Sequence, residues 1–339
     1  MTQPLSPRRL LPGLALALVI SALAYGVEWV EIRLWGRAYL EALVVAILLG
    51  AVWRTVIGLP VRAASGIRFA AKPVMEGAVA LMGASVSLAV LAHTGLALAG
   101  AIAGTIALTI LAGYRIGRWL GLPVRMALLV ACGNAICGNS AIAAVAPAID
   151  ADGEDVAAAV GFTAVMGIVV VLAVAPLAWA LQLSPVQGGM LAGMTVYAVP
   201  QVLAAAGPLG AMAVQVGAVV KLVRVLMLAP VVAVLSVLGG KAQAQEGMGA
   251  GGHLARLVPG FILVFLGLAG LRSLGLVGDG LAALAHGLSM GGTVVAMAGL
   301  GLGVDLRQLR AAGPRVSAAV VLSLVVLFAG ALAVIHWLG

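Results

Sequence analysis

Long apolar runs divide this sequence, and short segments between them hold most of its charges. A helix that crosses a bilayer needs about 20 mostly apolar residues. Charged residues make up only 9% of the chain, against about 25% in soluble domains. We therefore predict an all-α polytopic membrane protein, one transporter domain over residues 1–339 with about eleven transmembrane helices. The predicted spans are Leu10–Val27, Leu40–Ile57, Val74–Ala92, Leu96–Ile116, Val124–Ile149, Val156–Leu181, Val186–Ala206, Ala211–Leu238, Leu257–Leu274, Leu281–Val304 and Val316–Leu338.

Basic residues gather in alternate loops of this eleven-span arrangement. The loops on one side hold Arg62, Arg68, Lys72, Arg115, Arg118, Arg125, Lys241, Arg256, Arg307, Arg310 and Arg315. An acidic loop, residues 150–155, falls on the other side. Basic loops stay in the cytoplasm, so we predict a multi-pass inner-membrane protein with a cytoplasmic N-terminus and a periplasmic C-terminus.

Eleven spans divide into one extra helix, residues 10–27, and two groups of five, residues 40–181 and 186–338. An odd number of spans per group forces the two copies into opposite orientations, which predicts an inverted repeat. The glycine-rich segment 239–256 reads as a flexible cytoplasmic loop. A likeness between Ala80–Gly95 and Ala296–Gly313 supports a different pairing of spans, and the sequence leaves both pairings open.

Two polar, glycine-rich stretches interrupt the apolar runs. The first is Cys132–Ser140, with Asn134, Asn139 and Ser140, and the second is Ser289–Thr293. Unpaired polar groups cost several kcal/mol, on the order of 2–7, in an apolar medium. We predict that both stretches are broken helices at mid-membrane, and that their free backbone N–H groups form part of a substrate site.

A pair of cations lies inside the eighth predicted span. Lys221 and Arg224 are three residues apart and share a helix face. Each costs roughly 2.5–3.5 kcal/mol near the bilayer centre, and no Asp or Glu lies near the middle of any predicted span. A bound anion is the partner we predict. Two alternatives stay open: backbone carbonyls of the broken helices could satisfy both charges, or the side chains could extend to the membrane surface.

In the seventh span, Tyr197 and Gln201 share a face on either side of Pro200. The phenol could donate to an anion or could be an ordinary core hydroxyl. The predicted substrate-binding set is Asn134, Cys137, Gly138, Asn139, Ser140, Tyr197, Gln201, Lys221, Arg224, Ser289 and Thr293. Cys132 and Cys137 match no metal-ligand spacing, and the chain lacks a nucleophile elbow and paired carboxylates. We predict neither a metal site nor an enzyme.

Three segments carry a family resemblance. They are Ile136–Pro147, Val220–Pro230 with the pattern K-x-x-R-x-x-x-L-A-P, and Gly301–Leu306. All three resemble motifs of the YeiH-type sulfate exporters, the UPF0324 membrane proteins, over most of the chain after about residue 40. The resemblance implies a secondary transporter in the superfamily of bile-acid, arsenite and riboflavin transporters, with crossed broken helices. Many members carry a His-Glu pair where this chain has Tyr197 and Ala198.

The predicted function is secondary active transport of a small anion by alternating access. The anion is sulfate or a related sulfur-containing or organic anion. An anion channel and a membrane ligand sensor are the alternatives. No cofactor is predicted apart from a coupling ion, H⁺ or Na⁺. The expected partners are the anion and the bilayer, without nucleic acid, and the sequence leaves a homodimer open.

Overall fold

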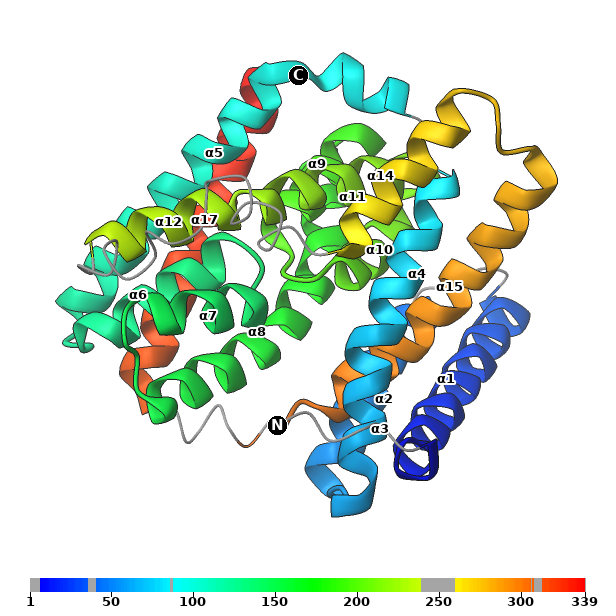
Figure 1. Cartoon of the computed structure of the whole chain (residues 1–339), viewed down its shortest axis with the longest axis horizontal. Coiled ribbons are helices and arrows are strands. Elements are labelled where there is room, and N and C mark those ends of the chain that lie inside the picture. The colour runs from blue at the N-terminus through cyan, green and yellow to red at the C-terminus, as the bar shows by residue number, and fades with distance from the viewer. Residues whose placement is uncertain are drawn as a thin grey trace, which may run out of the picture. The chain divides into compact units, whose positions relative to one another are not determined.

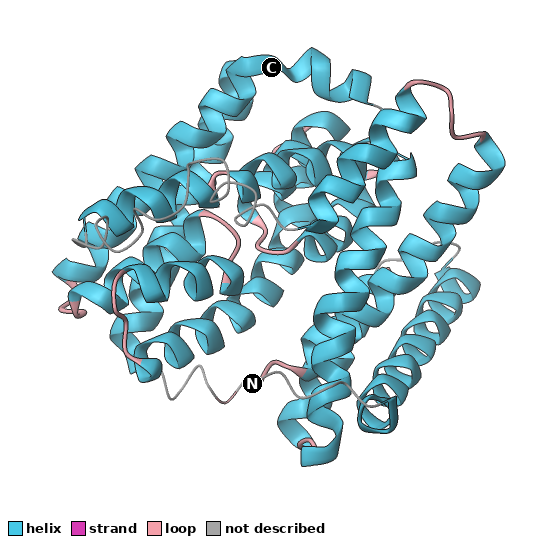
Figure 2. Ribbon diagram, viewed as in Figure 1, coloured by secondary structure: helices cyan, strands magenta, loops and turns pink. Residues whose placement is uncertain are grey.

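The computed structural model describes residues 7–35, 41–85, 88–238, 260–305, 307 and 313–338. Within these ranges the chain forms helices joined by loops and contains no strand (Figure 2). The predicted all-α class is therefore confirmed for the described residues. The predicted flexible loop 239–256 lies outside them.

The helices differ widely in length (Figure 1). The long ones are α1 (Pro7–Trp35), α5 (Leu88–Trp119), α8 (Gly153–Ala180), α11 (Ala211–Leu226), α15 (Asp279–Leu302) and α17 (Gly313–Leu338). The shorter ones are α2 (Ala42–Val56), α3 (Ala64–Phe69), α4 (Met75–Met82), α6 (Val124–Ala135), α7 (Asn139–Val145), α9 (Pro185–Thr195), α10 (Val199–Ala206), α12 (Leu228–Leu238) and α14 (Gly260–Ser273).

In the described chain, six helical segments are long and apolar enough to cross a membrane. They are Leu10–Leu34, Ala97–Trp119, Gly153–Ala180, Ala211–Val237, Asp279–Leu302 and Gly313–Leu338. The structure thus supports a multi-pass membrane protein. The count of eleven spans is not confirmed, because the other predicted spans correspond to shorter or interrupted helices.

The chain forms two compact units. Unit 1 contains residues 1–90, 203–208 and 261–306, and unit 2 contains residues 91–202, 209–260 and 307–339. Each unit takes segments from both predicted repeats, 40–181 and 186–338. The inverted repeat itself therefore stays unconfirmed.

In unit 1, helix α15 packs along α2 and α4, and α1 lies against α2 and α3 (Figure 1). Small residues allow the backbones to approach closely: a methyl group on Gly50 would lie 2.8 Å from the carbonyl oxygen of Ala298. Between α3 and α4 the helix continues through a π-helical turn, Ala70–Val74, that contains Pro73.

The predicted break at Ser289–Thr293 is wrong. Helix α15 runs through this stretch without interruption. Both hydroxyls find backbone partners, since Ser289 Oγ donates to Ala78 O at 2.7 Å and Thr293 Oγ1 donates to Ser289 O at 2.7 Å. Gly292 faces α4, where a methyl group would lie 3.1 Å from Ala78 Cβ. The polar, glycine-rich composition therefore serves close helix packing.

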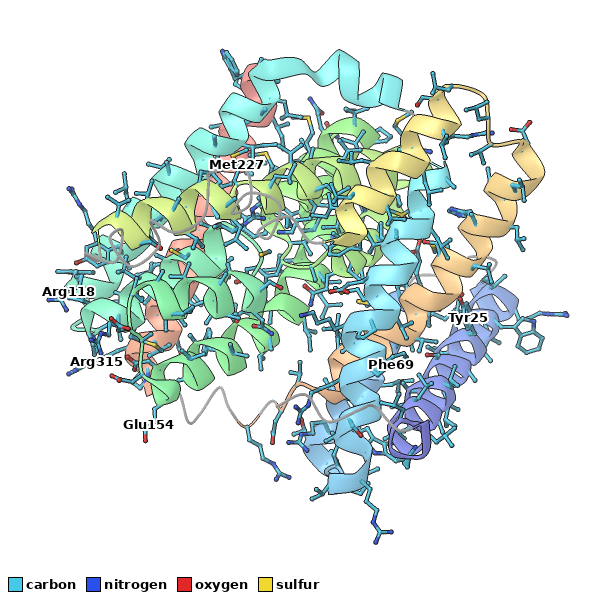
Figure 3. All side chains as sticks on the ribbon, viewed as in Figure 1. Tyr25, Phe69, Arg118, Glu154, Met227 and Arg315 are labelled. Atoms are coloured by element: carbon cyan, nitrogen blue, oxygen red, sulfur yellow. The ribbon has the colours of Figure 1, made fainter. Side chains whose placement is uncertain are left out.

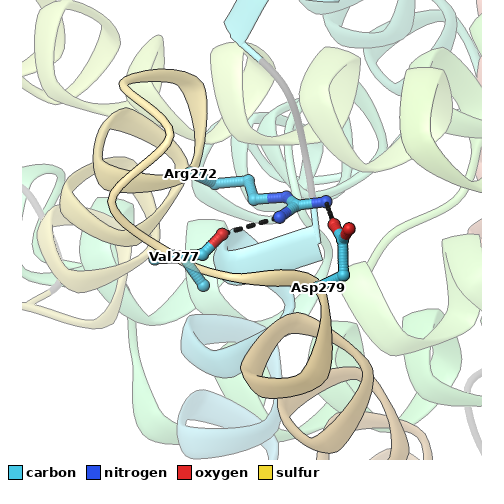
Figure 4. Close-up of polar contacts among 3 residues, drawn as sticks. All are labelled: Arg272, Val277 and Asp279. Atoms are coloured by element: carbon cyan, nitrogen blue, oxygen red, sulfur yellow. Dashed lines mark hydrogen bonds and ion pairs between the residues drawn. The ribbon is translucent and has the colours of Figure 1, made fainter.

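The turn between α14 and α15 is held by one arginine (Figure 4). Arg272 donates from Nη1 to Val277 O at 2.6 Å and from Nη2 to Asp279 Oδ1 at 2.7 Å. The loop holds a single basic residue, so it adds little to the count of basic residues used to predict orientation.

In unit 2, the predicted fifth span is a helical hairpin. Helix α6 has 12 residues, about 18 Å, which is too short to cross a bilayer. After the turn at Ile136–Gly138, α7 runs back beside it: a methyl group on Gly133 would lie 3.0 Å from Ile142 Cδ1. At the open end, Arg125 Nη1 lies 3.4 Å from Asp152 Oδ2. These residues would be about 40 Å apart in a continuous helix, so the chain returns to the end where α6 begins.

The predicted seventh span is a second hairpin, formed by α9 and α10; residues 203–206 of α10 are assigned to unit 1. Helices α9 and α11 run parallel, because Gly189 packs against Ala213 and Gly193 packs against Gly217. The connecting α10 must therefore return toward the start of α9. Leu209 lies beside Gly188 there, with its Cδ1 2.7 Å from the position of a methyl group on that glycine.

The two hairpins enter unit 2 from opposite ends. The contacts that each hairpin makes along α8 show this. Asp152, just before α8, lies at the open end of the first hairpin, and Thr163 lies beside the turn of that hairpin. Farther along α8, Gly167 lies against Tyr197 at the turn of the second hairpin, and Ala178 faces Gly188 near its open end. The crossed broken helices that the family resemblance implies are not observed, because both segments turn back.

This topology corrects the predicted position of the acidic loop 150–155. The loop lies at the same end of unit 2 as Arg125, and Figure 3 shows Glu154 at that end together with Arg118 and Arg315. Acidic residues contribute little to the positive-inside rule. Replacing two spans by two hairpins removes an even number of crossings, so the predicted placement of the termini on opposite sides is unchanged.

Cysteine labelling tests the first hairpin. In a background with Cys132→Ala and Cys137→Ala, we expect Asp152→Cys and Arg118→Cys to react with a membrane-impermeant maleimide from the same side. Gln182→Cys, in the turn after α8, should react from the other side, because α8 is about 42 Å long. Labelling of Asp152→Cys from the side opposite to Arg118→Cys, with Gln182→Cys on the side of Arg118→Cys, would restore a continuous fifth span.

Candidate functional site

The turns of the two hairpins meet inside unit 2. Tyr197, in the turn between α9 and α10, donates its hydroxyl to Asn134 Oδ1 at 2.7 Å. Asn134 in turn donates its Nδ2 to Val320 O on α17 at 3.0 Å. Both side chains are buried. One asparagine therefore ties the first hairpin to the second hairpin and to the last helix.

Lys221 and Arg224 on α11 bind the carbonyl ends of both hairpins. Lys221 Nζ donates to Ile136 O at 2.5 Å. Arg224 donates from Nε to Ala135 O at 2.8 Å, from Nη2 to Asn134 O at 2.7 Å and from Nη1 to Val196 O at 3.2 Å. The last four carbonyls of a helix have no partner within the helix and carry its negative dipole end. Lys221 and Arg224 supply the missing hydrogen-bond donors and the positive charge where α6 and α9 end.

Of the three sequence hypotheses for this pair, the structure matches the one in which carbonyls of the broken helices accept from both cations. Lys221 is 0% exposed and Arg224 is 1% exposed. Extension to the membrane surface is therefore wrong. A direct contact with an anion stays a prediction. The hydrogen bonds that both side chains donate in the structure go to protein carbonyls.

With both side chains protonated, the charge around the turns is positive. Each helix end supplies roughly half a negative charge, which is less than the two full charges of Lys221 and Arg224. In the described part of unit 2, all carboxylates fall within residues 150–155. The nearest along α8, Asp155, precedes Thr163 by about 12 Å of helix. The surplus is therefore not neutralised locally by an acidic side chain of this unit.

One part of the first turn is exposed. Asn139 and Ser140 begin α7 and are exposed, whereas Asn134 through Gly138 are buried. Thr163 Oγ1 on α8 lies 2.7 Å from Asn139 Oδ1 and holds that side chain in place. The N-terminal end of α7 thus presents polar side chains and the positive end of a helix dipole at an accessible surface.

The other predicted residues of unit 2 support the turns. Gln201 Oε1 accepts from the backbone N–H of Ala198 at 3.2 Å and caps the start of α10. Cys137 is a buried member of the first turn. On α8, a methyl group at Gly167 would lie 2.9 Å from Gln201 Nε2 and 3.2 Å from Tyr197 Cδ2, so glycine there admits both side chains.

The structure thus brings together nine of the predicted residues in unit 2: Asn134, Cys137, Gly138, Asn139, Ser140, Tyr197, Gln201, Lys221 and Arg224. Ser289 and Thr293 belong to unit 1 and are not part of this cluster. An open apolar groove of about 580 Å³ also belongs to unit 1, between α1 and the end of α2, and no charged side chain lines it.

Sequence reasoning missed the residues that support the cluster. Thr163 is one polar residue in an apolar helix, and nothing local marks it as a partner of Asn139. The four-residue spacing of Gly189 and Gly193 is a recognisable signal for close helix packing. Those glycines, with Gly217, bring α9 against α11. Arg224 on α11 can therefore donate to Val196 O at the end of α9.

Gly138 is a position where only glycine fits. Its φ of 65° and ψ of −124° lie in a region that other residues rarely adopt, and a methyl group would lie 3.2 Å from Tyr197 Cβ. We expect Gly138→Ala to reduce the free energy of unfolding by about 1–3 kcal/mol. Thermal unfolding in detergent measures this. Gly153→Ala is the control, because it starts α8 with open space around it; equal melting temperatures would refute the strain argument.

The sequence matches a family model described as Conserved hypothetical protein 698 over residues 12–320. It is also 51% identical to a UPF0324 membrane protein of Agrobacterium fabrum, over 95% of this chain and 91% of the relative. The chain belongs to the UPF0324 membrane protein family. A second UPF0324 relative, from Brucella suis, is 48% identical over 98% of both chains, and one from Bacillus cereus is 33% identical over 89% and 87%.

Membership in the UPF0324 family confirms the resemblance drawn from the three motifs. Two of the motifs lie at the hairpin cluster: Ile136–Pro147 forms the first turn with α7, and Val220–Pro230 carries Lys221 and Arg224. No solved structure matches this chain. The names of the relatives describe membrane proteins and state no substrate.

Proposed function

We propose that this UPF0324 protein is a secondary active transporter that moves a small anion across the inner membrane by alternating access. The observation that carries the proposal is the meeting of two opposed hairpin turns beside two buried cations. Short helices that end inside the protein are tolerated in a membrane only where protein or a water-filled cavity surrounds them. Such interrupted helices form the substrate sites of many transporters.

The charge balance favours an anion. Lys221 and Arg224 exceed the dipole charge of the helix ends they bind, and Asn139 is at most three Cα steps, about 11 Å, from Ile136. At about 10 Å and an effective dielectric constant of about 20, one unit charge attracts an anion by about 1.7 kcal/mol. The cations act on the anion through this field, while their hydrogen bonds stay with the carbonyls.

The direct ligands are the exposed groups at the start of α7. The hydroxyl of Ser140 and the side-chain amide of Asn139 supply neutral donors, and the first backbone N–H groups of α7 point toward the same end. Small oxyanions suit this donor set. Sulfate and related sulfur-containing or organic anions are therefore the substrates we propose, in keeping with the family resemblance.

The same proposal includes an orientation. The end of unit 2 with Arg118, Arg125 and Arg315 faces the cytoplasm, because basic residues near span ends stay on that side. The C-terminal end of α17 then faces the periplasm, and the N-terminus lies in the cytoplasm.

Ligand-dependent thermal stability tests the site. Purified protein is melted with sulfate, sulfite, a sulfonate, a carboxylate or chloride, and counterflow in proteoliposomes follows for any anion that stabilises it. At 100 times its dissociation constant, a ligand adds about 2.7 kcal/mol to stability. We expect one class of anion to stabilise wild type, and Ser140→Ala and Asn139→Ala to lose that shift.

The matched control is Ser317→Ala, a serine on α17 that bonds to Gly313 O and not to the turns. It should retain the full ligand shift. If no anion stabilises wild type, or if Ser140→Ala and Asn139→Ala keep the wild-type shift, the anion site at α7 is refuted. Binding without counterflow would leave a ligand sensor in place of a transporter.

A further inference from the structure

The ends of α6 and α9 have the composition of a cation site. Carbonyl oxygens at the C-terminal ends of interrupted helices coordinate coupling ions such as Na⁺ in many secondary transporters. Here four carbonyls converge from two hairpins: those of Asn134, Ala135 and Ile136 at the end of α6, and that of Val196 at the end of α9. In this chain, the side-chain nitrogens of Lys221 and Arg224 donate to all four carbonyls.

The cationic groups of Lys221 and Arg224 are fixed to the protein and do not bind and dissociate as a free ion does. Both side chains are almost completely buried, and each is anchored to α11, which packs against α9 through Gly189, Gly193 and Gly217. Lys221 donates to a carbonyl of the first hairpin, whereas Arg224 donates to carbonyls of both hairpins. A covalently attached cation stays with the protein through every transport cycle, so it cannot carry the free energy of an ion gradient.

We propose that Lys221 and Arg224 are built-in replacements for coupling cations, so that transport by this protein requires no Na⁺. The inference rests on the proposed function, because it treats the hairpin turns as the transport site. It reduces the choice of coupling ion by excluding Na⁺. A gradient of protons or of a counter-transported anion would then supply the energy. Lys221 is the specificity-determining residue, because its ammonium group donates to Ile136 O.

The proposal predicts a gain of cation binding when the ammonium is removed. Lys221→Ala leaves the Ile136 carbonyl facing a cavity of the size of the lost side chain, which can admit a small cation with water. Lys221→Met fills most of that space without a donor or an opening. The two variants therefore separate loss of the charge from creation of a site.

The experiment is thermal unfolding of purified protein in NaCl against choline chloride at equal ionic strength, without a transport substrate. We expect no Na⁺-specific shift in wild type, a saturable increase of at least about 3 °C in Lys221→Ala, and no shift in Lys221→Met. If Lys221→Ala cannot be purified, Lys221→Ser provides the same cavity with one added oxygen ligand. A Na⁺-specific shift in wild type, or none in Lys221→Ala or Lys221→Ser, would overturn the proposal.

A second measurement keeps this inference apart from the proposed function. Anion-dependent stabilisation of wild type is recorded in buffer that contains choline and no Na⁺. If the anion shift is present in that buffer, anion binding does not require Na⁺, and the Na⁺ experiment on Lys221→Ala then tests the inference by itself. If the anion shift requires Na⁺, the built-in cations do not replace the coupling ion and the inference fails, although an anion site would stand.

Discussion

Replacing Arg224 with methionine is expected to destabilise the protein more than any other single change in unit 2. The substitution removes a buried charge and leaves the carbonyls of Asn134, Ala135 and Val196 without this donor. An unsatisfied buried polar group costs about 1–3 kcal/mol, and a hydrogen bond to a charged group contributes about 1.5–3 kcal/mol. We expect a loss at the upper end of this range, measured by thermal unfolding in detergent.

The same substitution at Arg125 is the matched control. Arg125 is 47% exposed and pairs with Asp152 at 3.4 Å, and exposed pairs contribute only about 0–1 kcal/mol. Arg224→Lys should fall between the two, because an ammonium keeps the charge but cannot reach carbonyls of both hairpins as a guanidinium does. If Arg224→Met melts at the temperature of Arg125→Met, the bridge between the hairpins contributes nothing to stability.

The second large effect is expected at Asn134. Asn134→Leu keeps roughly the side-chain volume but leaves the buried Tyr197 hydroxyl without its acceptor and removes the donor to Val320 O. Two lost hydrogen bonds at a buried position should cost about 2–4 kcal/mol. Tyr197→Phe removes one of them and should cost about 1–2 kcal/mol, again measured by thermal unfolding.

A double-mutant cycle isolates the contact between the two turns. Replacing both partners by apolar groups costs less than the sum of the single changes, because neither leaves the other unsatisfied. The double variant should therefore be more stable than additivity predicts by at least about 0.5 kcal/mol. Strict additivity would mean that the hydrogen bond between Tyr197 and Asn134 does not couple the two turns.

Several features were readable from residue order alone. Low charge and repeated apolar runs predict a helical membrane protein. The polar stretch Cys132–Ser140 predicts an interrupted helix, which the structure has at Ile136–Gly138. Two cations three apart on an apolar helix indicate a shared buried partner, and the motifs around them indicate the family. Each of these signals is local in sequence, so periodicity and composition are sufficient to detect it.

Other features depend on which segments meet. Apolar residues on either side of a break suit a helix that continues across a membrane and equally suit one that turns back. The ion pair of Arg125 with Asp152 and the packing of Gly133 on Ile142 distinguish the two cases, and both are contacts between residues far apart in sequence. Ser289–Thr293 shows the opposite error: its polar groups are satisfied by α4 and by its own helix, and no break results.

What the sequence by itself determined is that two charges had to be compensated inside an apolar protein, since burying them unpaired costs too much free energy. It could not determine what compensates them. An anion and a helix end present similar negative potentials, and only the folded chain places one of them within hydrogen-bonding distance. Tertiary structure made that choice by bringing the C-terminal ends of α6 and α9 to Lys221 and Arg224.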